Sequence, residues 1–190
     1  MGNPARIFLE TDMRTETIEV FQFDELSNAA KQRAREWYCS DGDVWHWSGE
    51  WWDSAVAFSG IAPVEIREIH WDRADPTIRW TGEDALRDLS GVRAWKWLHN
   101  NGWFDLAARN VMGDCTLTGY CGDCDFFDPI DKYRRNPLGV PDLETLFRDC
   151  VYGWAFAALH DMEHAYSDEA IDETIRANGY EFDAGGKFWA

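Results

Sequence analysis

The hydrophobic positions at the start of the chain first alternate and then take up helical spacing. Residues 15–23, TETIEVFQF, alternate polar residues with β-branched or aromatic ones, which predicts a strand. After Ser27, a residue type favoured at helix N-caps, apolar residues recur three or four positions apart through AAKQRAREWY and predict a helix. SDGD at 40–43 should end that helix. Residues 1–14 have no period, and we expect a loose N-terminal arm there.

The next pattern predicts a helix followed by a hairpin. SGEWWDSAVAFSGI, residues 48–61, has helical spacing, and 64–71 and 77–80 alternate as strands do on either side of DRADP. Asp and Pro in that intervening segment favour a turn. We expect four side chains of the helix to face the core: Trp51, Trp52, Ala55 and Val56.

The middle of the chain has a less regular pattern. Thr81 is a candidate N-cap for a helical segment that ends at Gly102 and that Gly91 divides into two. Residues 103–127 are aromatic and rich in Cys, Gly and Asp, so we expect strands and turns there rather than helix. Residues 128–141 contain three prolines and predict a loop.

The strongest pattern lies near the C-terminus. Residues 142–166 carry one continuous apolar stripe, which predicts a long helix. Ser167 precedes Asp168 and Glu169 as a good N-cap for another helix, which should stop near Gly179 before a short strand at YEF. The complete pattern predicts an α+β fold, an antiparallel sheet packed against several helices, in a single domain spanning 15–190.

Size and composition agree with a globular protein of the cytoplasm. A chain of 190 residues buries enough apolar surface to fold without a metal or a disulfide. Its five cysteines are an odd number, and no apolar signal segment opens the chain, which predicts a reduced cytoplasmic protein. No apolar run reaches membrane-spanning length. We expect no cofactor and no membrane contact.

The charge of the chain restricts its partners. There are 35 acidic and 18 basic residues, giving a formal charge of −17, which repels nucleic acid and attracts basic protein surfaces. General solubility would explain the same acidity. Acidic residues gather among aromatic ones in DGDVWHWSGEWWD, 41–53, and in DCDFFDPID, 123–131, a combination suited to binding a basic partner. The candidate partner-binding residues are Asp41, Asp43, Glu50, Asp53, Asp123, Asp125, Asp128 and Asp131.

One segment raises the question of zinc catalysis. His160, Glu163 and His164 form H-x-x-E-H, and histidines four apart share one face of a helix. The motif resembles that of inverted zincins. The distant glutamate that serves those peptidases as third ligand is missing, since only Glu169 and Glu173 of the adjacent short helix follow. His160 also lies well away from the apolar stripe. We therefore predict exposed histidines, and a zinc-dependent hydrolase remains the less favoured alternative.

A second group of metal-ligand residues is incomplete. Cys115, Cys121 and Cys124 form C-x5-C-x2-C, of which C-x2-C can supply half of a tetrahedral zinc site. No other Cys or His lies nearby in sequence. Packing or turn cysteines are therefore the favoured interpretation, and we predict no metal. The chain also lacks G-x-S-x-G and the glycine-rich phosphate-binding patterns, so no catalytic residues are assigned and a non-enzymatic protein is expected.

Two segments of the sequence resemble a known family. FDELSNAAKQRAREWY, 23–38, with EWWDS, and SDEAIDETIRANGYEF, 167–182, are similar to the two ends of small uncharacterised proteins of tailed bacteriophages and prophages, sometimes labelled antitoxin-like. IREIHWDRADPTIRWTGE resembles that family's hairpin more loosely, since Pro76 stands in its turn. A phage origin implies residence in the host bacterial cytoplasm and favours inhibitors of host defence.

Together, charge and resemblance lead to a hypothesis. We expect an acidic protein that occupies the basic, nucleic-acid-binding surface of a host defence complex, in the manner of anti-CRISPR or anti-restriction inhibitors, with DNA mimicry as one form of it. It would not bind nucleic acid directly. The alternative is an antitoxin-like protein that neutralises a basic toxin, and the sequence does not separate the two.

Overall fold

The computed structural model describes residues 19–41 and 44–189, and the chain divides into two compact units. One unit combines Met1–Gly42 with Ile171–Ala190, and the other is Asp43–Ala170. The predicted α+β class is confirmed, because helices are combined with two antiparallel two-stranded sheets. The predicted arm at 1–14 lies outside the described residues.

The first unit joins the two ends of the described chain. Strand β1 (Phe21–Gln22) pairs antiparallel with β4 (Glu181–Phe182), so Phe21 faces Phe182. Only this end of the strand predicted at 15–23 is formed in the described residues. A 3-10 turn, η1 (Phe23–Glu25), leads into α1 (Asn28–Asp41). The Ser27 hydroxyl accepts from the Ala30 amide at 3.3 Å, which confirms the predicted N-cap.

Helix α8 (Asp168–Asn178) supplies the other side of this unit. It begins with the predicted cap, since the Ser167 hydroxyl accepts from the Ala170 amide at 3.2 Å. The Arg35 guanidinium of α1 donates to both carboxylate oxygens of Asp172 at 2.6 and 2.8 Å, a paired geometry that fixes orientation as well as charge. Aromatic rings fill the rest, and Trp37 stacks on Phe188 at 4.0 Å.

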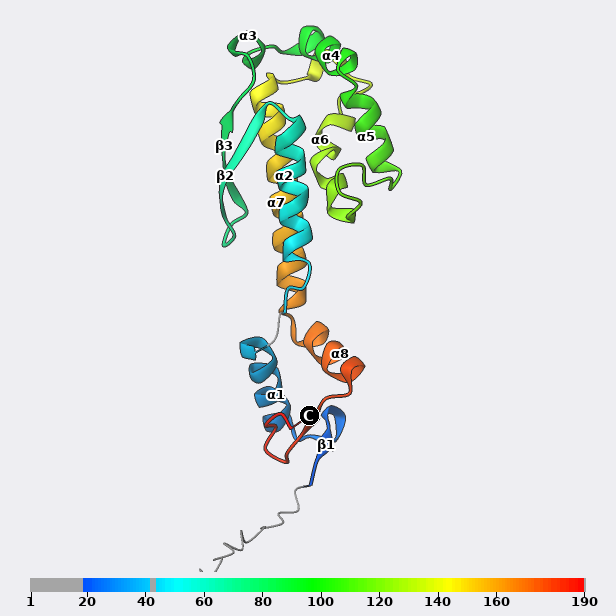
Figure 1. The fold of residues 1–190 in the computed structure, drawn as a ribbon. Coiled ribbons are helices and arrows are strands. Elements are labelled where there is room, and N and C mark those ends of the chain that lie inside the picture. Colours follow the sequence, from blue (N-terminus) through cyan, green and yellow to red (C-terminus); the bar gives the residue numbers. More distant parts are fainter. Residues whose placement is uncertain (1–18, 42–43, 190) are drawn as a thin grey trace, which may run out of the picture. The chain divides into compact units, whose positions relative to one another are not determined.

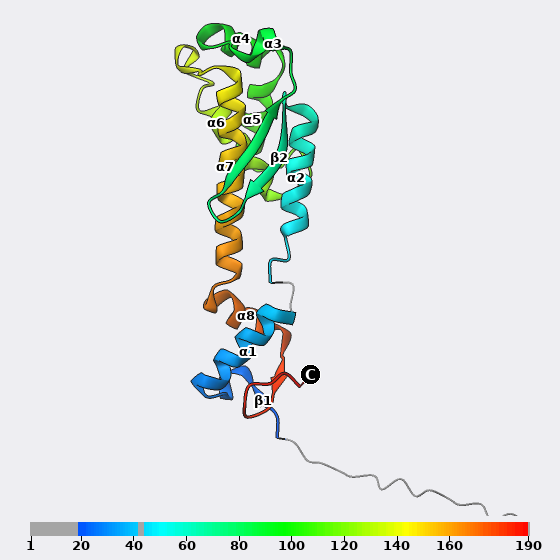
Figure 2. The ribbon, with the colours of Figure 1, turned by 90° about the vertical axis from the view of Figure 1, so that its left-hand side faces the viewer.

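The second unit is built around two helices, α2 (Ser48–Ile61) and α7 (Leu143–Ala165). Figures 1 and 2 show these helices running side by side, with the β2–β3 hairpin against one side of the pair and α5 and α6 on the opposite side. The predicted long helix is confirmed. Its N-cap is Asp142, whose carboxylate accepts from the Thr145 amide at 2.8 Å. The predicted stripe lies in the core: Leu143, Leu146, Phe147, Cys150, Val151, Trp154 and Ala158 are buried.

The hairpin consists of β2 (Val64–His70) and β3 (Asp75–Trp80) and confirms that two strands form here. Asp75 and Pro76, which were predicted in the turn, instead belong to β3 and pair with His70 and Ile69. The strands pair antiparallel, with a register shift between Ile66 and Glu68. One prediction for α2 was wrong. Trp52 and Val56 are 48% and 56% exposed, because the buried face of the helix is Trp51, Ser54, Ala55 and Phe58. At about 100° per residue, positions 52 and 56 turn away from that face.

The segment predicted to form strands and turns at 103–127 has turns at 112–120 but no strand, and nearly all the rest of it is helical. It contains α5 (Trp103–Val111), whose buried Trp103, Phe104, Ala107 and Asn110 have helical spacing, and a 3-10 helix, η2 (Cys121–Phe126). The residues predicted as a loop at 128–141 form two short turns, α6 (Asp128–Asp131) and η3 (Pro137–Gly139).

Two short helices precede α5. The segment predicted at 81–102 contains α3 (Asp84–Arg87) and α4 (Gly91–Asn100). Gly91 divides them as predicted. Thr81 does not cap either, because Glu83 and Ser90 occupy the N-cap positions. Among the described helices, none has the combined length and apolar character that would let it cross a membrane.

Candidate functional site

Three segments that are far apart in the sequence line one groove of the second unit. Its volume is about 510 Å³, and its walls are Trp51 on α2, residues between 120 and 125 around η2, and residues between 157 and 164 on α7. These segments carry the tryptophan and acid cluster, the C-x2-C pair and the H-x-x-E-H motif of the sequence. We call this feature the groove. It is the candidate functional site because the separate motifs meet there.

A buried carboxylate shapes the η2 wall of the groove. Asp123 is fully buried and accepts hydrogen bonds from the backbone amides of Leu117, Thr118 and Gly119 at 2.9, 2.7 and 3.2 Å. The hydroxyls of Ser54 and Thr118 lie 2.7 and 3.0 Å from its other oxygen. These donors offset the cost of removing the charge from water. Asp123 was therefore wrongly predicted as a partner-binding residue, since it holds the 117–119 turn and is inaccessible.

Two indoles fix a carboxylate on the α7 wall. The indole N–H groups of Trp45 and Trp51 both donate to Oδ2 of Asp161 at 2.9 Å. Tyr120 packs edge-on against Trp51 with ring centroids 5.4 Å apart, and Trp47 lies nearly parallel to Tyr120 at 6.3 Å. Sequence reasoning missed Asp161 and Tyr120, because no local pattern indicates that Asp161 meets residues more than 100 positions earlier.

Two glycines allow the walls to approach closely. A Cβ on Gly122 would lie 2.7 Å from the ring of Trp51, closer than side chains pack. A Cβ on Gly153 of α7 would lie 3.1 Å from the carbonyl oxygen of Asp125. Glycine at these positions lets η2 lie directly against both helices. Gly122 is visible in the sequence as the glycine of C-G-D-C, but only the fold shows that it packs against Trp51.

The groove carries negative charge that its lining does not neutralise. Burial, with a further contribution from Asp128, raises the pKa of Asp125 from 3.8 to about 6. Burial and the neighbouring Asp131 likewise raise the pKa of Asp128. Among residues 19–41 and 44–189, no lysine or arginine lines the groove. Burial and the charge of Asp161 also raise the pKa of Tyr120, so its ring remains a neutral phenol.

The other predicted partner-binding residues are dispersed. Asp53 is exposed and Glu50 half-buried on α2. Asp128 lines a different cavity of about 360 Å³ together with Lys132 and Asp149, and Asp131 pairs with Arg134 at 3.1 Å. The Asp41 side chain and Asp43 lie outside the described residues. The acidic run 123–131 is thus not one continuous surface, because its four aspartates face four different environments.

The groove also brings together the thiols and imidazoles that the sequence separates. Cys121, Cys124, His160 and His164 all line it. The Cys124 thiol donates to the Cys121 carbonyl at 2.7 Å, and burial raises its pKa to about 11. Within the described ranges, no three His, Cys, Asp or Glu side chains are placed so that they could hold a metal ion.

The other residues of those motifs lie outside the groove. Glu163 is exposed and does not line the groove, so the H-x-x-E-H motif does not enter it as a unit. Cys115 lies outside as well. The four donors that meet in the groove are therefore neighbours without coordinating geometry.

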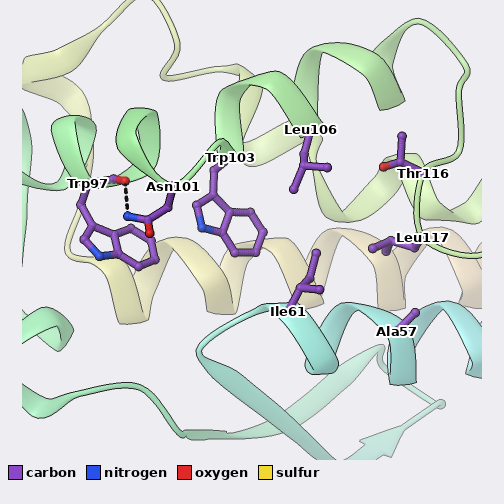
Figure 3. A pocket seen from close by; sticks show the side chains of 8 residues that line it. All are labelled: Ala57, Ile61, Trp97, Asn101, Trp103, Leu106, Thr116 and Leu117. Atoms are coloured by element: carbon purple, nitrogen blue, oxygen red, sulfur yellow. Dashed lines mark hydrogen bonds between the residues drawn. The ribbon is translucent and has the colours of Figure 1, made fainter.

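A second cavity of the same unit has a different chemistry. It has a volume of about 490 Å³ and lies between α2, α4, α5 and the 116–117 segment. Figure 3 shows Asn101 between the indoles of Trp97 and Trp103, with its amide donating to the Trp97 carbonyl at 2.8 Å. Its remaining walls are mainly aliphatic, and none of the described residues that line it is charged. This cavity can accept an apolar group, but it has no charge with which to select a partner.

Comparison with known proteins gives no further assignment: no protein-family model, no curated protein and no solved structure matches this chain. The chemistry of the groove is therefore the basis for a functional assignment.

Proposed function

We propose that this chain is a non-enzymatic binding protein whose acidic surface occupies the basic, nucleic-acid-binding surface of a partner protein. The observation that carries the proposal is Asp125. Its carboxylate is half-buried beside Asp128, which raises its pKa, and no lysine or arginine of the described chain lines the groove with it. Burial and the neighbouring carboxylate destabilise the ionised form of Asp125, and a cation that approaches the groove would stabilise that form.

The charge of the whole chain supports a protein partner rather than a nucleic acid. A formal charge of −17 repels phosphates and accelerates encounter with basic surfaces. Basic surfaces of this kind are common on proteins that bind DNA or RNA. The resemblance to tailed-phage proteins favours a host defence complex in the bacterial cytoplasm as the partner.

The arginines of the chain add to this picture. Many of them already pair with acids elsewhere on the surface: Arg67 and Arg79 with Glu65, Arg87 with Glu144, and Arg109 with Asp114. Their charge is thereby neutralised locally. The excess of acids remains available to a partner, and Asp125 and Asp161 are two of these acids that line the groove.

The test is affinity capture followed by competition with DNA. Tagged protein is used to capture partners from bacterial lysates with active defence systems, at about 50 and then 200 mM salt. Each captured protein is then purified, and displacement of a labelled duplex from it is measured. The double variant Glu50→Gln with Asp125→Asn should displace the duplex less well. A matched control, Glu83→Gln with Asp84→Asn, neutralises two exposed acids away from the groove and should act as the parent.

Two results would contradict the proposal. Capture that persists unchanged in the double variant of Glu50 and Asp125 would show that these carboxylates do not contact the partner. A captured protein that binds no nucleic acid, such as a small basic toxin, would favour the antitoxin-like alternative instead. Salt-sensitive capture of a DNA-binding complex, with loss of duplex from it, would support the proposal.

A further inference from the structure

We infer that the groove receives an arginine side chain of the partner, stacked on Tyr120 and paired with the carboxylates of Asp161 and Asp125. This inference deepens the proposed function and rests on it for the existence of a basic partner. It is a separate statement about the groove, because a partner could also be held by acids elsewhere on the surface.

The first support is the aromatic wall. Tyr120 lines the groove, with Trp47 lying nearly parallel at 6.3 Å and Trp51 edge-on at 5.4 Å. Trp47 is 55% exposed, so this cluster is open to the surface. A cation over an aromatic face is attracted by the ring quadrupole, and a neutral phenol preserves that face.

The second support is the state of Asp161. Its Oδ2 atom is occupied by the two indole donors, whereas its Oδ1 atom accepts no hydrogen bond from the described part of the chain. The carboxylate is half-buried and held in place by side chains that are themselves packed. One edge of a positioned carboxylate is thus available for an incoming donor, and Asp125 lines the same groove.

The third support is the match to arginine in particular. A guanidinium is planar, stacks on aromatic rings, donates in a fork and is less strongly hydrated than an ammonium group. It therefore suits a half-buried groove with a ring on one side and carboxylates on the other. A metal ion fits less well, because the Cys and His donors of the groove lack coordinating geometry.

The test uses three short capped peptides, Gly-Arg-Gly, Gly-Lys-Gly and Gly-citrulline-Gly, titrated against the full chain by calorimetry. Arginine should bind more tightly than lysine, and citrulline, which keeps the shape but not the charge, should not bind measurably. Tyr120→Phe keeps the ring and should behave as the parent, whereas Tyr120→Leu should weaken arginine binding about fivefold. Asp161→Asn should weaken it about tenfold. Glu83→Gln with Asp84→Asn serves again as the control.

Equal binding of arginine and citrulline peptides, or equal binding by Tyr120→Leu and Tyr120→Phe, would overturn the inference. Zn²⁺ alone is titrated in parallel. Stoichiometric Zn²⁺ binding lost in Cys121→Ser with Cys124→Ser would also overturn it, in favour of a metal site. If a partner is captured but the Tyr120 and Asp161 variants capture it as well as the parent, the groove inference fails and the proposed function stands. Failure to capture any basic partner refutes the proposed function irrespective of the peptide result.

Discussion

Neutralising Asp125 should stabilise the protein at neutral pH. The carboxylate is half-buried beside Asp128, and its pKa of about 6 lies roughly two pH units above the ordinary 3.8. A pKa raised on folding means that the folded state holds its proton more tightly than the unfolded chain does. The stability from this group is fully present below about pH 4 and is lost as the pH rises through 6. Asp125→Asn removes that loss.

The magnitude follows from the pKa and the exposure of the group. Two pH units correspond to ~3 kcal/mol for a fully buried carboxyl. Because Asp125 is only half-buried and solvent screens its charge, we expect ~1 kcal/mol of stabilisation at pH 7 and near zero at pH 4. In a chain of this length, that is a rise in midpoint temperature of about 2–4 °C.

The assay is urea unfolding followed by tryptophan fluorescence, at pH 4 and at pH 7, for the parent and Asp125→Asn. Asp53→Asn is the matched control, because Asp53 is an exposed aspartate of α2, and it should change stability by less than ~0.5 kcal/mol at either pH. A stabilisation of equal size at both pH values would refute the reasoning, because it would not come from the charge. So would a loss of stability at pH 7.

Three further predictions concern packing and hydrogen bonding. Asp123→Ala should lower the free energy of unfolding by ~3–5 kcal/mol in urea titrations, because it leaves three partly buried amide donors and the buried Ser54 hydroxyl without their acceptor. Gly122→Ala should cost ~1–3 kcal/mol, because the new methyl group would press against the ring of Trp51. The near-UV circular dichroism of the protein should change with it, and an unaltered spectrum would contradict this contact. Phe188→Ala removes the ring stacked on Trp37, and should accelerate amide hydrogen exchange in α1 and α8 while leaving α7 as protected as in the parent.

The sequence was most informative where a local pattern determines the structure. The stripe at 143–158 requires one face of a helix to be covered, and Ser27 and Ser167 cap the turns that follow them, so α7, α1 and α8 could all be predicted. Helix α5 was missed because Gly, Cys and Asp around it obscured the helical spacing of Trp103, Phe104 and Ala107.

The groove could not be predicted, because long-range packing creates it. Cys124 and His160 lie 36 positions apart, and only the packing of η2 against α7 makes them neighbours. The role of Asp123 was hidden for a related reason. An aspartate in an acidic run predicts a solvated surface, and only the turn at 117–119 shows that its charge is buried among donors. Of the candidate residues taken from charge alone, Asp123 was assigned the wrong role, because it is buried and holds the 117–119 turn.

The pairing of β1 with β4 has a consequence for the growing chain on the ribosome. Phe21 faces Phe182, so β1 cannot form its strand pair until some 160 residues later have been made. At about 5–20 residues per second, that delay is roughly 10–30 s. The second unit is complete in sequence before β4 emerges, and it can fold during this time. Until then the apolar face of α1, with Ala30 and Ala34, remains exposed, and chaperones can bind it. The first unit is therefore the last to fold.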